Sequence, residues 1–269
     1  YIKVEPDKRR IVGYSTRNSG GVPDNFRNWF VIEFECDLEF VNTVAENMVS
    51  EVLEQSGNHV GAIVGFRTSR GEQIQMKVAS SFISLEQALL NLQEVKGSSF
   101  DVLGRVEVSG GTDDELKTFY TCLYRSTLFP RKFYELNEQG EVYHYSPYNG
   151  KVLPGYMYTD TGFWDTFRCL FPLLNLIYPS VNKEIQEGLL NVYKESGFYP
   201  EWASPGHRDC MVGNNSASVI ADAYLKGVKV DDMETLYEGL IATANKEHPT
   251  MKSTGRWGCG YYNRLGYVP

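Results

Sequence analysis

Long hydrophobic runs are absent from this sequence. No stretch of about 18 or more apolar residues occurs, so we expect no membrane-spanning helix. The residues from Tyr1 onward also lack the basic and then apolar segments that mark a signal peptide. Hydrophobic residues still make up 42% of the 269 residues, which is enough for a buried core. We therefore expect one large globular domain or two ordinary ones.

Positive charge is also scarce. The formal net charge is −8 and the sequence pI is about 5.2. A chain of this charge repels a phosphate backbone, so we expect no nucleic-acid partner. A neutral ligand fits the composition better.

Cysteine and histidine are few and widely spaced. The four histidines show neither HExxH nor another i, i+4 pair, so a zinc site is unsupported. The cysteines form no CxxC pair, and their odd number gives no obvious disulfide framework. We interpret most of them as buried apolar side chains. The five cysteines are Cys36, Cys122, Cys169, Cys210 and Cys259.

Aromatic residues are the one excess, with 18 Tyr, 14 Phe and 4 Trp making up 13% of the chain. Many of them stand beside Gly or Pro in predicted loops. Such rings can stack on the apolar faces of sugars, but they are also ordinary core material. For any single ring, the core is the more frequent place.

The first 83 residues follow the alternation of β-strands. Apolar residues alternate with acidic ones from Phe30 to Phe40, which predicts one half-buried strand. Residues 59–68 and 72–80 alternate likewise, and Ser69-Arg70-Gly71 between them predicts a hairpin turn. We therefore expect residues 1–83 to form an antiparallel β region that is part of a sandwich.

From Ser84 the period changes to that of a helix. Ser84 and Gln87 have the spacing of a capping box, which predicts a short helix that ends near Gly97. A strand is expected from Arg105 to Ser109. Residues 84–111 are thus predicted to be a linker with one helix and one strand.

Helices dominate the prediction for residues 112–269. Segment 164–177 is apolar on nearly every side, with Pro172 predicted to kink or break it. In two concentric layers of helices, an inner helix is covered on all sides and an outer helix keeps one face exposed to solvent. A nearly all-apolar helix that alternates with amphipathic ones therefore predicts an α/α toroid. Only four or five helices are visible, so we expect an open ring that needs further sequence or another chain. The helical segments are 116–127, 164–177, 182–197, 215–227 and one that opens at Asp231-x-x-Glu234.

The segment from Tyr158 to Arg168 carries the most informative pattern. Gly162 permits a turn, and Trp164, Asp165 and Arg168 then fall on the first turn of a helix. A carboxylate that accepts sugar hydroxyls, a guanidinium that donates to them and an indole packed on the ring would form a hexose subsite. The alternative is an Asp165–Arg168 ion pair with Trp164 in the core, which spacing alone slightly favours.

A second candidate is the long loop from Gly197 to Gly213, although its Gly and Pro residues equally fit a plain connection between helices. Four of its residues could form a pocket wall: Trp202, His207, Arg208 and Asp209. Glycoside hydrolysis needs two carboxylates at a defined separation, which a sequence alone does not give. The eligible acids are Asp160, Asp165, Glu201 and Asp209.

An ordered series of motifs resembles glycoside hydrolase family 92. The match is firm from about residue 75 onward and looser before it. The motifs are Ser84-Leu-Glu-Gln-Ala88, Phe119-Tyr-Thr-Cys-Leu-Tyr124, Phe163-Trp-Asp-Thr-Phe-Arg168, Gly197-Phe-Tyr-Pro-Glu-Trp202, Met211-Val-Gly213, Ala221-Asp-Ala-Tyr-Leu-Lys-Gly227 and Gly266-Tyr-Val-Pro269.

The resemblance implies a calcium-dependent, inverting exo-α-mannosidase that acts on terminal α-mannose of N-glycans or mannans. A glutamic acid would protonate the leaving oxygen and an aspartate would activate water, while Ca2+ would bind sugar hydroxyls and help distort the ring. By similarity, the substrate-binding residues are Trp164, Asp165 and Arg168 in the terminal-mannose subsite and Trp202 and Met211 in neighbouring loops.

The resemblance also implies a multi-domain α and β fold. The expected parts are a portion of the N-terminal β-sandwich at 1–83, the linker at 84–111 and the first part of an (α/α)6 catalytic domain at 112–269. The catalytic acid, base and calcium ligands are expected beyond Pro269, so we expect an inactive middle fragment with no metal site of its own. Two positions depart from the family pattern: Glu201 replaces an arginine or lysine, and Asn215 replaces a histidine.

Two other functions remain open at this point. The chain could be a non-catalytic carbohydrate-binding or structural unit, or part of another α/α-toroid glycosidase. The expected partners are a mannose-containing glycan and the remainder of the polypeptide, or another chain, that completes the barrel. The family resemblance implies a periplasmic or extracellular location.

Overall fold

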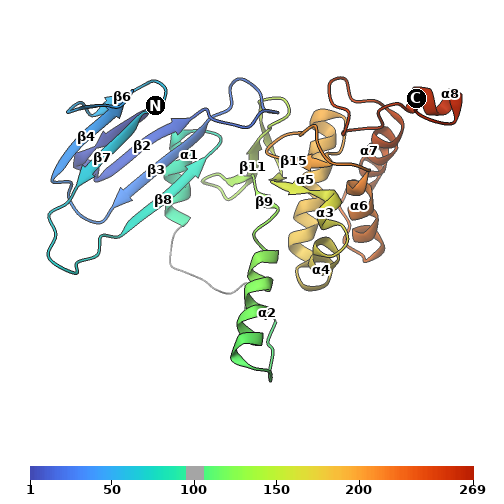
Figure 1. Ribbon diagram of the computed structural model, residues 1–269, viewed down its shortest axis with the longest axis horizontal. Helices are drawn as coiled ribbons and strands as arrows, with labels where there is room; N and C mark the ends of the chain where they lie inside the picture. Colours follow the sequence, from blue (N-terminus) through green and yellow to red (C-terminus); the bar gives the residue numbers. More distant parts are fainter. Residues whose placement is uncertain (95–105) are drawn as a thin grey trace. The chain divides into compact units, whose positions relative to one another are not determined.

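The computed structural model describes residues 1–94 and 106–269, which form two compact units. Unit 1 contains residues 1–18, 25–94 and 135–141, and unit 2 contains residues 19–24, 106–134 and 142–269. Figure 1 shows the strands of unit 1 in blue to teal and the helices of unit 2 in green to red. Each unit has a hydrophobic core of its own.

The larger sheet of unit 1 has the strand order β6-β1-β2-β3-β8, with antiparallel neighbours. One face of this sheet packs on helix α1 (Leu85–Asn91), where Val12, Val31 and Ala88 are buried together. A 3-10 turn, η1 (Pro6–Lys8), connects the first two strands. The strands are β1 (Ile2–Glu5), β2 (Arg10–Ser15), β3 (Asn28–Phe34), β6 (Glu54–Gln55) and β8 (Met76–Ser81).

A second sheet of unit 1 has the order β5-β4-β7. Its strands are β4 (Phe40–Ala45), β5 (Met48–Ser50) and β7 (Gly61–Gly65). Val4 and Ile11 of the larger sheet form a core cluster with Val41 and Val64 of this one. The two sheets therefore share a core between them, and the expected antiparallel β region is confirmed.

The single strand predicted from Phe30 to Phe40 is wrong. β3 ends at Phe34 and β4 begins at Phe40, because the chain crosses here from one sheet to the other. Arg9 holds the crossing, with its Nε 2.6 Å from Asp37 Oδ1. Alternation cannot reveal the crossing, since side chains of both strands point into the shared core.

The hairpin predicted from residues 59–68 and 72–80 is also wrong. The turn itself exists, because Glu72 N donates to Ser69 O at 3.1 Å and Gly71 has a φ of 87°. However, β7 pairs with β4 and β8 pairs with β3, so the two strands lie in different sheets.

The predicted linker is confirmed at its start only. Ser84 Oγ accepts a hydrogen bond from Gln87 N at 3.1 Å, so α1 begins where expected. α1 ends at Asn91 and the turn η2 (Leu92–Glu94) follows, while Gly97 and Arg105 lie outside the described residues.

Residues 106–109 are not the predicted strand. The Tyr120 hydroxyl donates to Val106 O at 3.2 Å and accepts from Val108 N at 3.3 Å. These are backbone groups that a strand would use for pairing.

Unit 2 is built mainly of helices, with short strand pairs between them. The helices are α2 (Asp113–Ser126), α3 (Phe163–Thr166), α4 (Leu170–Ile177), α5 (Pro179–Ser196), α6 (Asn215–Leu225), α7 (Met233–Asn245) and α8 (Cys259–Leu265). Three antiparallel pairs join β9 (Arg131–Lys132) to β13 (Tyr158–Thr159), β11 (Val142–Tyr145) to β12 (Val152–Pro154), and β14 (Thr161–Gly162) to β15 (Trp202–Ala203). Strand β10 (Glu135–Leu136) belongs to unit 1.

Helices α4 to α7 form the core of unit 2. Phe171, Ile185, Val219 and Leu236, one from each helix, belong to one buried cluster. Capping explains several predicted boundaries. Thr112 and Glu115 form a complete capping box at the start of α2, and Gly197 ends α5 with a φ of 81°.

The single helix predicted for residues 164–177 is two helices. The break lies at residues 167–169, and Pro172 is the third residue of α4. Proline is tolerated in a first turn because its missing N–H would have no helical partner there. The expectation that this segment is covered on all sides is also wrong, since Leu176 is 78% exposed.

Two further burial predictions are wrong. Helical spacing predicts that Tyr224 on α6 and Tyr237 on α7 face inward, but they are 47% and 62% exposed. The cysteines are free and none is buried: three are exposed and two are half-buried. An open cluster of helices has too little interior for every apolar side chain that helical spacing selects.

Candidate functional site

The candidate site forms where strands β14 and β15 meet. The two strands pair antiparallel, with Gly162 opposite Trp202 and Thr161 opposite Ala203. Phe163 N, the first N–H of α3, donates to the Glu201 carbonyl oxygen at 3.0 Å. The predicted helix start and the predicted loop are therefore joined, although about 40 residues of chain separate them.

Gly162 lets the Trp202 ring come close to the backbone. A Cβ added to Gly162 would lie 2.5 Å from a carbon of the Trp202 ring and 2.9 Å from Asp165 Oδ2. The φ of Gly162 is −103°, which any residue can adopt, so close approach rather than backbone conformation calls for glycine. The Trp202 ring and the Asp165 carboxylate thus lie side by side over Gly162.

Asp165 lies on the single turn of α3, where its side chain is exposed. Within residues 1–94 and 106–269, no group donates a hydrogen bond to its carboxylate and no cation pairs with it. Trp164, beside it, is 41% exposed. Asp165 and Trp164 are therefore accessible to a ligand, and the expectation that Trp164 is core does not hold.

Arg168 contacts aromatic rings instead of Asp165. Its guanidinium carbon lies 4.3 Å from the centre of the Phe167 ring and 5.6 Å from that of Trp164. Nη1 also donates to the Trp164 carbonyl oxygen. An Asp165–Arg168 ion pair, the alternative considered above, is not among the ion pairs of the described chain. The Asp165 carboxylate is therefore not paired with this guanidinium.

The other polar residues of the loop have structural partners. His207 is buried, with its Nε2 3.0 Å from Ser196 Oγ, and burial lowers its pKa to about 3. Arg208 donates to the carbonyl and the hydroxyl of Ser19. Asp209 Oδ1 accepts from the backbone N–H groups of residues 252 and 253, and the bond from Ser253 lowers the pKa of Asp209.

Met211 is half-buried and has a φ of 75°. In the described part of the chain, no hydrogen bond or ring contact links it to Trp202 or Asp165. The five predicted substrate-binding residues thus fall into three groups. Asp165 and Trp202 meet at Gly162, Arg168 stacks on Trp164, and Met211 makes up the third group by itself.

Among the four acids eligible for catalysis, three have hydrogen-bond or ion-pair partners in the described chain, and Asp165 does not. Asp160 pairs with Arg131 and accepts from Ser204 Oγ at 2.8 Å. Asp209 is held by backbone N–H groups, as described above. Glu201 is buried at the start of α6, where Asn215 N donates to its Oε2 at 2.9 Å.

Sequence reasoning missed the pairing of Glu201 with Asn215. The two positions at which the sequence departs from the family pattern contact each other, because Asn215 Nδ2 also lies 3.3 Å from Glu201 Oε2. Burial raises the pKa of Glu201, and hydrogen bonds from Asn215 and Ser216 oppose that rise. A substituted pair at positions 14 residues apart is the only signal that could have suggested it.

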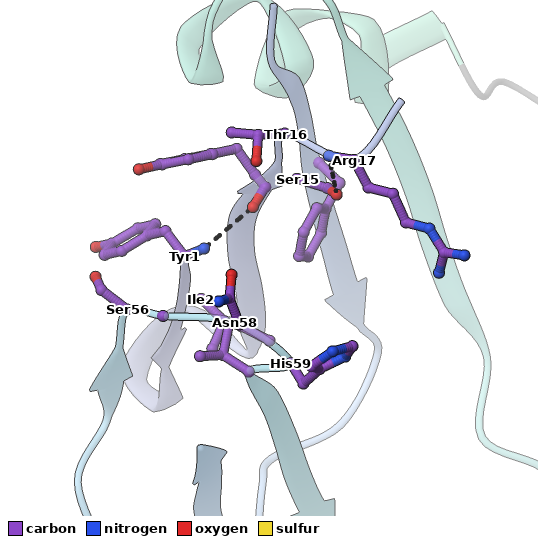
Figure 2. A pocket seen from close by; sticks show the side chains of 12 residues that line it. Tyr1, Ile2, Ser15, Thr16, Arg17, Ser56, Asn58 and His59 are labelled. Atoms are coloured by element: carbon purple, nitrogen blue, oxygen red, sulfur yellow. Dashed lines mark hydrogen bonds between the residues drawn. The ribbon is translucent and has the colours of Figure 1, made fainter. Parts of the chain in front are cut away.

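A pocket in unit 1 has a different character. Its volume is about 650 Å³, and its lining includes Tyr1, Tyr14, Arg17 and His59. In Figure 2 the Arg17 side chain extends away from Tyr1. None of the twelve described residues that line it is a carboxylic acid, so it lacks the groups that glycoside hydrolysis needs.

The described residues do not offer a metal site. Within residues 1–94 and 106–269, no three of the His, Cys, Asp and Glu side chains gather closely enough to hold an ion. Among the described helices, none has both the length and the apolar character needed to cross a membrane.

Comparison with known proteins places both parts of the chain in one family. Residues 1–81 match the family model of the glycosyl hydrolase family 92 N-terminal domain, and residues 100–269 match that of the catalytic domain. An uncharacterized secreted glycosidase of Arthroderma benhamiae is 26% identical over 216 residues, which cover 73% of this chain and 23% of that protein.

Solved structures give the same result. A family GH92 inverting mannosidase of Bacteroides thetaiotaomicron is 45% identical, with a TM-score of 0.93 over the whole of this chain and 38% of its own. A GH92 α-mannosidase of that organism is 26% identical, with TM-scores of 0.79 and, in complex with mannoimidazole, 0.78. This chain covers 38% and 37% of those two chains. The chain belongs to glycosyl hydrolase family 92.

Proposed function

We propose that the protein containing this chain is a calcium-dependent, inverting exo-α-mannosidase that removes terminal α-mannose from N-glycans or mannans. The observation that carries the proposal is the meeting of Trp202 and Asp165 over Gly162. The GH92 neighbours, whose names describe mannosidases, supply the substrate class.

In this proposal each side chain has a role that its surroundings allow. The unpartnered Asp165 carboxylate accepts hydrogen bonds from two sugar hydroxyls. The Trp202 indole, half-buried against Gly162, packs on the apolar face of the ring. Arg168, held over Phe167, donates to a further hydroxyl. Together the three form one terminal-mannose subsite, and Trp164 and Met211 extend its wall.

We place the catalytic acid, the catalytic base and the calcium ligands in the protein beyond Pro269. Three of the four eligible acids of this chain already have structural partners, as described above. An inverting enzyme also needs a second carboxylate at about 6.5–9.5 Å, with room for a water molecule. This chain spans 38% of the inverting mannosidase it resembles, which leaves ample sequence for those groups.

The helices of unit 2 would be the first part of an (α/α)6 barrel. Apolar side chains are exposed on several of its helices, among them Leu176 on α4, Leu225 on α6 and Ile241 on α7. Large apolar side chains exposed on neighbouring helices call for a covering surface. The remaining helices of the complete protein, or those of another chain, would supply it. A relative of this chain is named a secreted glycosidase, so we also place the protein outside the cell or in a periplasm.

The test is hydrolysis of an aryl α-mannoside by the full-length protein and by this chain alone, each with calcium and with a chelator. We expect turnover by the full-length protein only, loss of turnover with the chelator, and release of β-mannose seen by NMR. Robust turnover by this chain alone would refute the placement of the catalytic groups. Turnover of glucosides instead of mannosides would favour another α/α-toroid glycosidase, and mannose binding without any turnover would favour a carbohydrate-binding unit.

A further inference from the structure

Glu201 stands out among the charged residues of the described chain. Among the Asp, Glu, Lys and Arg residues of the described chain, only Glu201 is buried, with 1% of its surface exposed. No described lysine or arginine forms an ion pair with it. A carboxylate in such a place is tolerated only if hydrogen-bond donors satisfy it.

Four donors satisfy the Glu201 carboxylate, and all belong to the first two residues of α6. Oε2 accepts from Asn215 N at 2.9 Å and from Asn215 Nδ2 at 3.3 Å. Oε1 accepts from Ser216 Oγ at 3.1 Å and from Ser216 N at 3.5 Å. The carboxylate therefore caps the helix, where unpaired N–H groups and the helix dipole favour a negative charge.

The backbone of Glu201 is held as firmly as its side chain. Its carbonyl oxygen accepts from Phe163 N at 3.0 Å, at the start of α3. The next residue, Trp202, pairs with Gly162 in β14. Glu201 thus ties together the start of α3, strand β15 and the start of α6, and α3 itself packs against α6.

We propose that Glu201 is a positioning residue for the sugar subsite: by capping α6 it fixes Trp202 against Gly162 and beside Asp165. This inference rests on the proposed function, because the subsite is that of the proposed mannosidase. Glu201 itself faces the helix and does not touch the sugar. Its effect on binding passes through Trp202.

An amide cannot reproduce all four contacts of this carboxylate. The backbone N–H groups of Asn215 and Ser216 can only donate, whereas the Ser216 hydroxyl can also accept. In a Glu201→Gln variant the side-chain NH2 at the position of Oε1 could donate to Ser216 Oγ, but it would face Ser216 N, now 3.5 Å from Oε1. Relief requires a shift of β15 or of α6, and a shift of β15 moves the Trp202 ring.

The experiment compares full-length variants labelled with 5-fluorotryptophan, in which a Trp202→Phe variant assigns the Trp202 19F resonance. For Glu201→Gln we expect that resonance to shift or broaden. We also expect the dissociation constant of mannoimidazole, measured by calorimetry, to rise about tenfold. Ser216→Ala removes only one donor, so the same changes should follow in smaller measure, and this variant decides the question if Glu201→Gln does not fold.

Glu195→Gln is the matched control. Glu195 is also an acid of unit 2 with little exposure, at 7% of its side chain, and its Oε1 lies 2.9 Å from His144 Nε2. This variant should lower stability without moving the Trp202 resonance or weakening mannoimidazole. Equal weakening by Glu195→Gln and Glu201→Gln would overturn the inference, because the effect would then reflect stability alone.

Failure of the proposed function would look different. A wild-type protein that neither cleaves mannosides nor binds mannoimidazole would refute the mannosidase proposal. The Trp202 resonance would still decide the role of Glu201. A shift in Glu201→Gln but not in Glu195→Gln supports positioning, and an unchanged resonance in Glu201→Gln overturns it.

Discussion

Asp165→Asn is the substitution that separates sugar binding from stability most cleanly. Asp165 is exposed, and in the described chain no donor or cation contacts its carboxylate. Replacing it therefore leaves no buried group unsatisfied in the free protein, and we expect the free energy of unfolding to change by less than about 0.5 kcal/mol. Any large effect must come from the ligand.

The size of that effect follows from the chemistry of the carboxylate. A hydrogen bond to a charged group contributes about 1.5–3 kcal/mol. The amide of asparagine keeps one acceptor oxygen but turns a donor toward a second hydroxyl. Loss of one such bond corresponds to a fall in kcat/KM of roughly 10- to 150-fold.

The assay is the steady-state hydrolysis of an aryl α-mannoside by the full-length protein, together with urea unfolding of each variant. Asp209→Ala is the control, because Asp209 is also an exposed acid of unit 2 but its carboxylate accepts from backbone N–H groups. It should lose about 0.5–2 kcal/mol of stability and keep its kcat/KM. The reasoning fails if Asp165→Asn keeps wild-type kcat/KM, or if it unfolds as easily as Asp209→Ala.

Three further outcomes follow from the same contacts. Gly162→Ala places a methyl group 2.5 Å from the Trp202 ring, so about 1–3 kcal/mol of stability and much of the mannosidase activity should be lost together, as urea unfolding and kcat/KM would show. Burial lowers the pKa of His207 to about 3, so its contribution to stability is present above about pH 6.5 and is lost as the pH falls toward 3. Between those pH values the free energies of unfolding of wild type and His207→Gln, from urea unfolding, should change relative to each other by up to about 1.4 kcal/mol per pH unit. Ser84→Ala removes the cap of α1 and should cost about 1 kcal/mol in urea unfolding without changing kcat/KM.

Local signals in the sequence predicted several helix boundaries. The cap at Ser84 and the left-handed Gly197 each act within four residues of their partners, so a linear pattern contains them. The capping box at Thr112 is equally local, but the predicted helix began only at residue 116. Alternation also predicted the segments of unit 1 that contain β3, β7 and β8, but not β1 or β2. It did not predict their partners, because pairing between strands distant in sequence leaves no mark on either strand alone. The false hairpin of β7 and β8 shows that limit.

For the candidate site, too, local spacing predicted some features and long side-chain contacts were not predicted. Trp164 and Asp165 lie on α3, and Arg168 lies in the turn that follows it, so spacing predicted them as a group. Spacing did not predict that Arg168 would stack on Phe167 and leave Asp165 without a partner. That outcome depends on where the long Arg168 side chain finds apolar surface, which is a property of the folded helix.

The missed contact between Glu201 and Asn215 shows what a pattern can still offer. Each residue taken alone looked like a departure from the family, and a departure at one position suggests a lost function. The structure makes the two departures a single feature, in which a buried acid is satisfied by the start of a helix. Because each residue supplies what the other needs, changing one alone leaves a buried polar group unpaired. Departures that occur together in a sequence are therefore better examined as pairs, and here Glu201 of the pair directly precedes Trp202, whose ring we propose packs on the sugar.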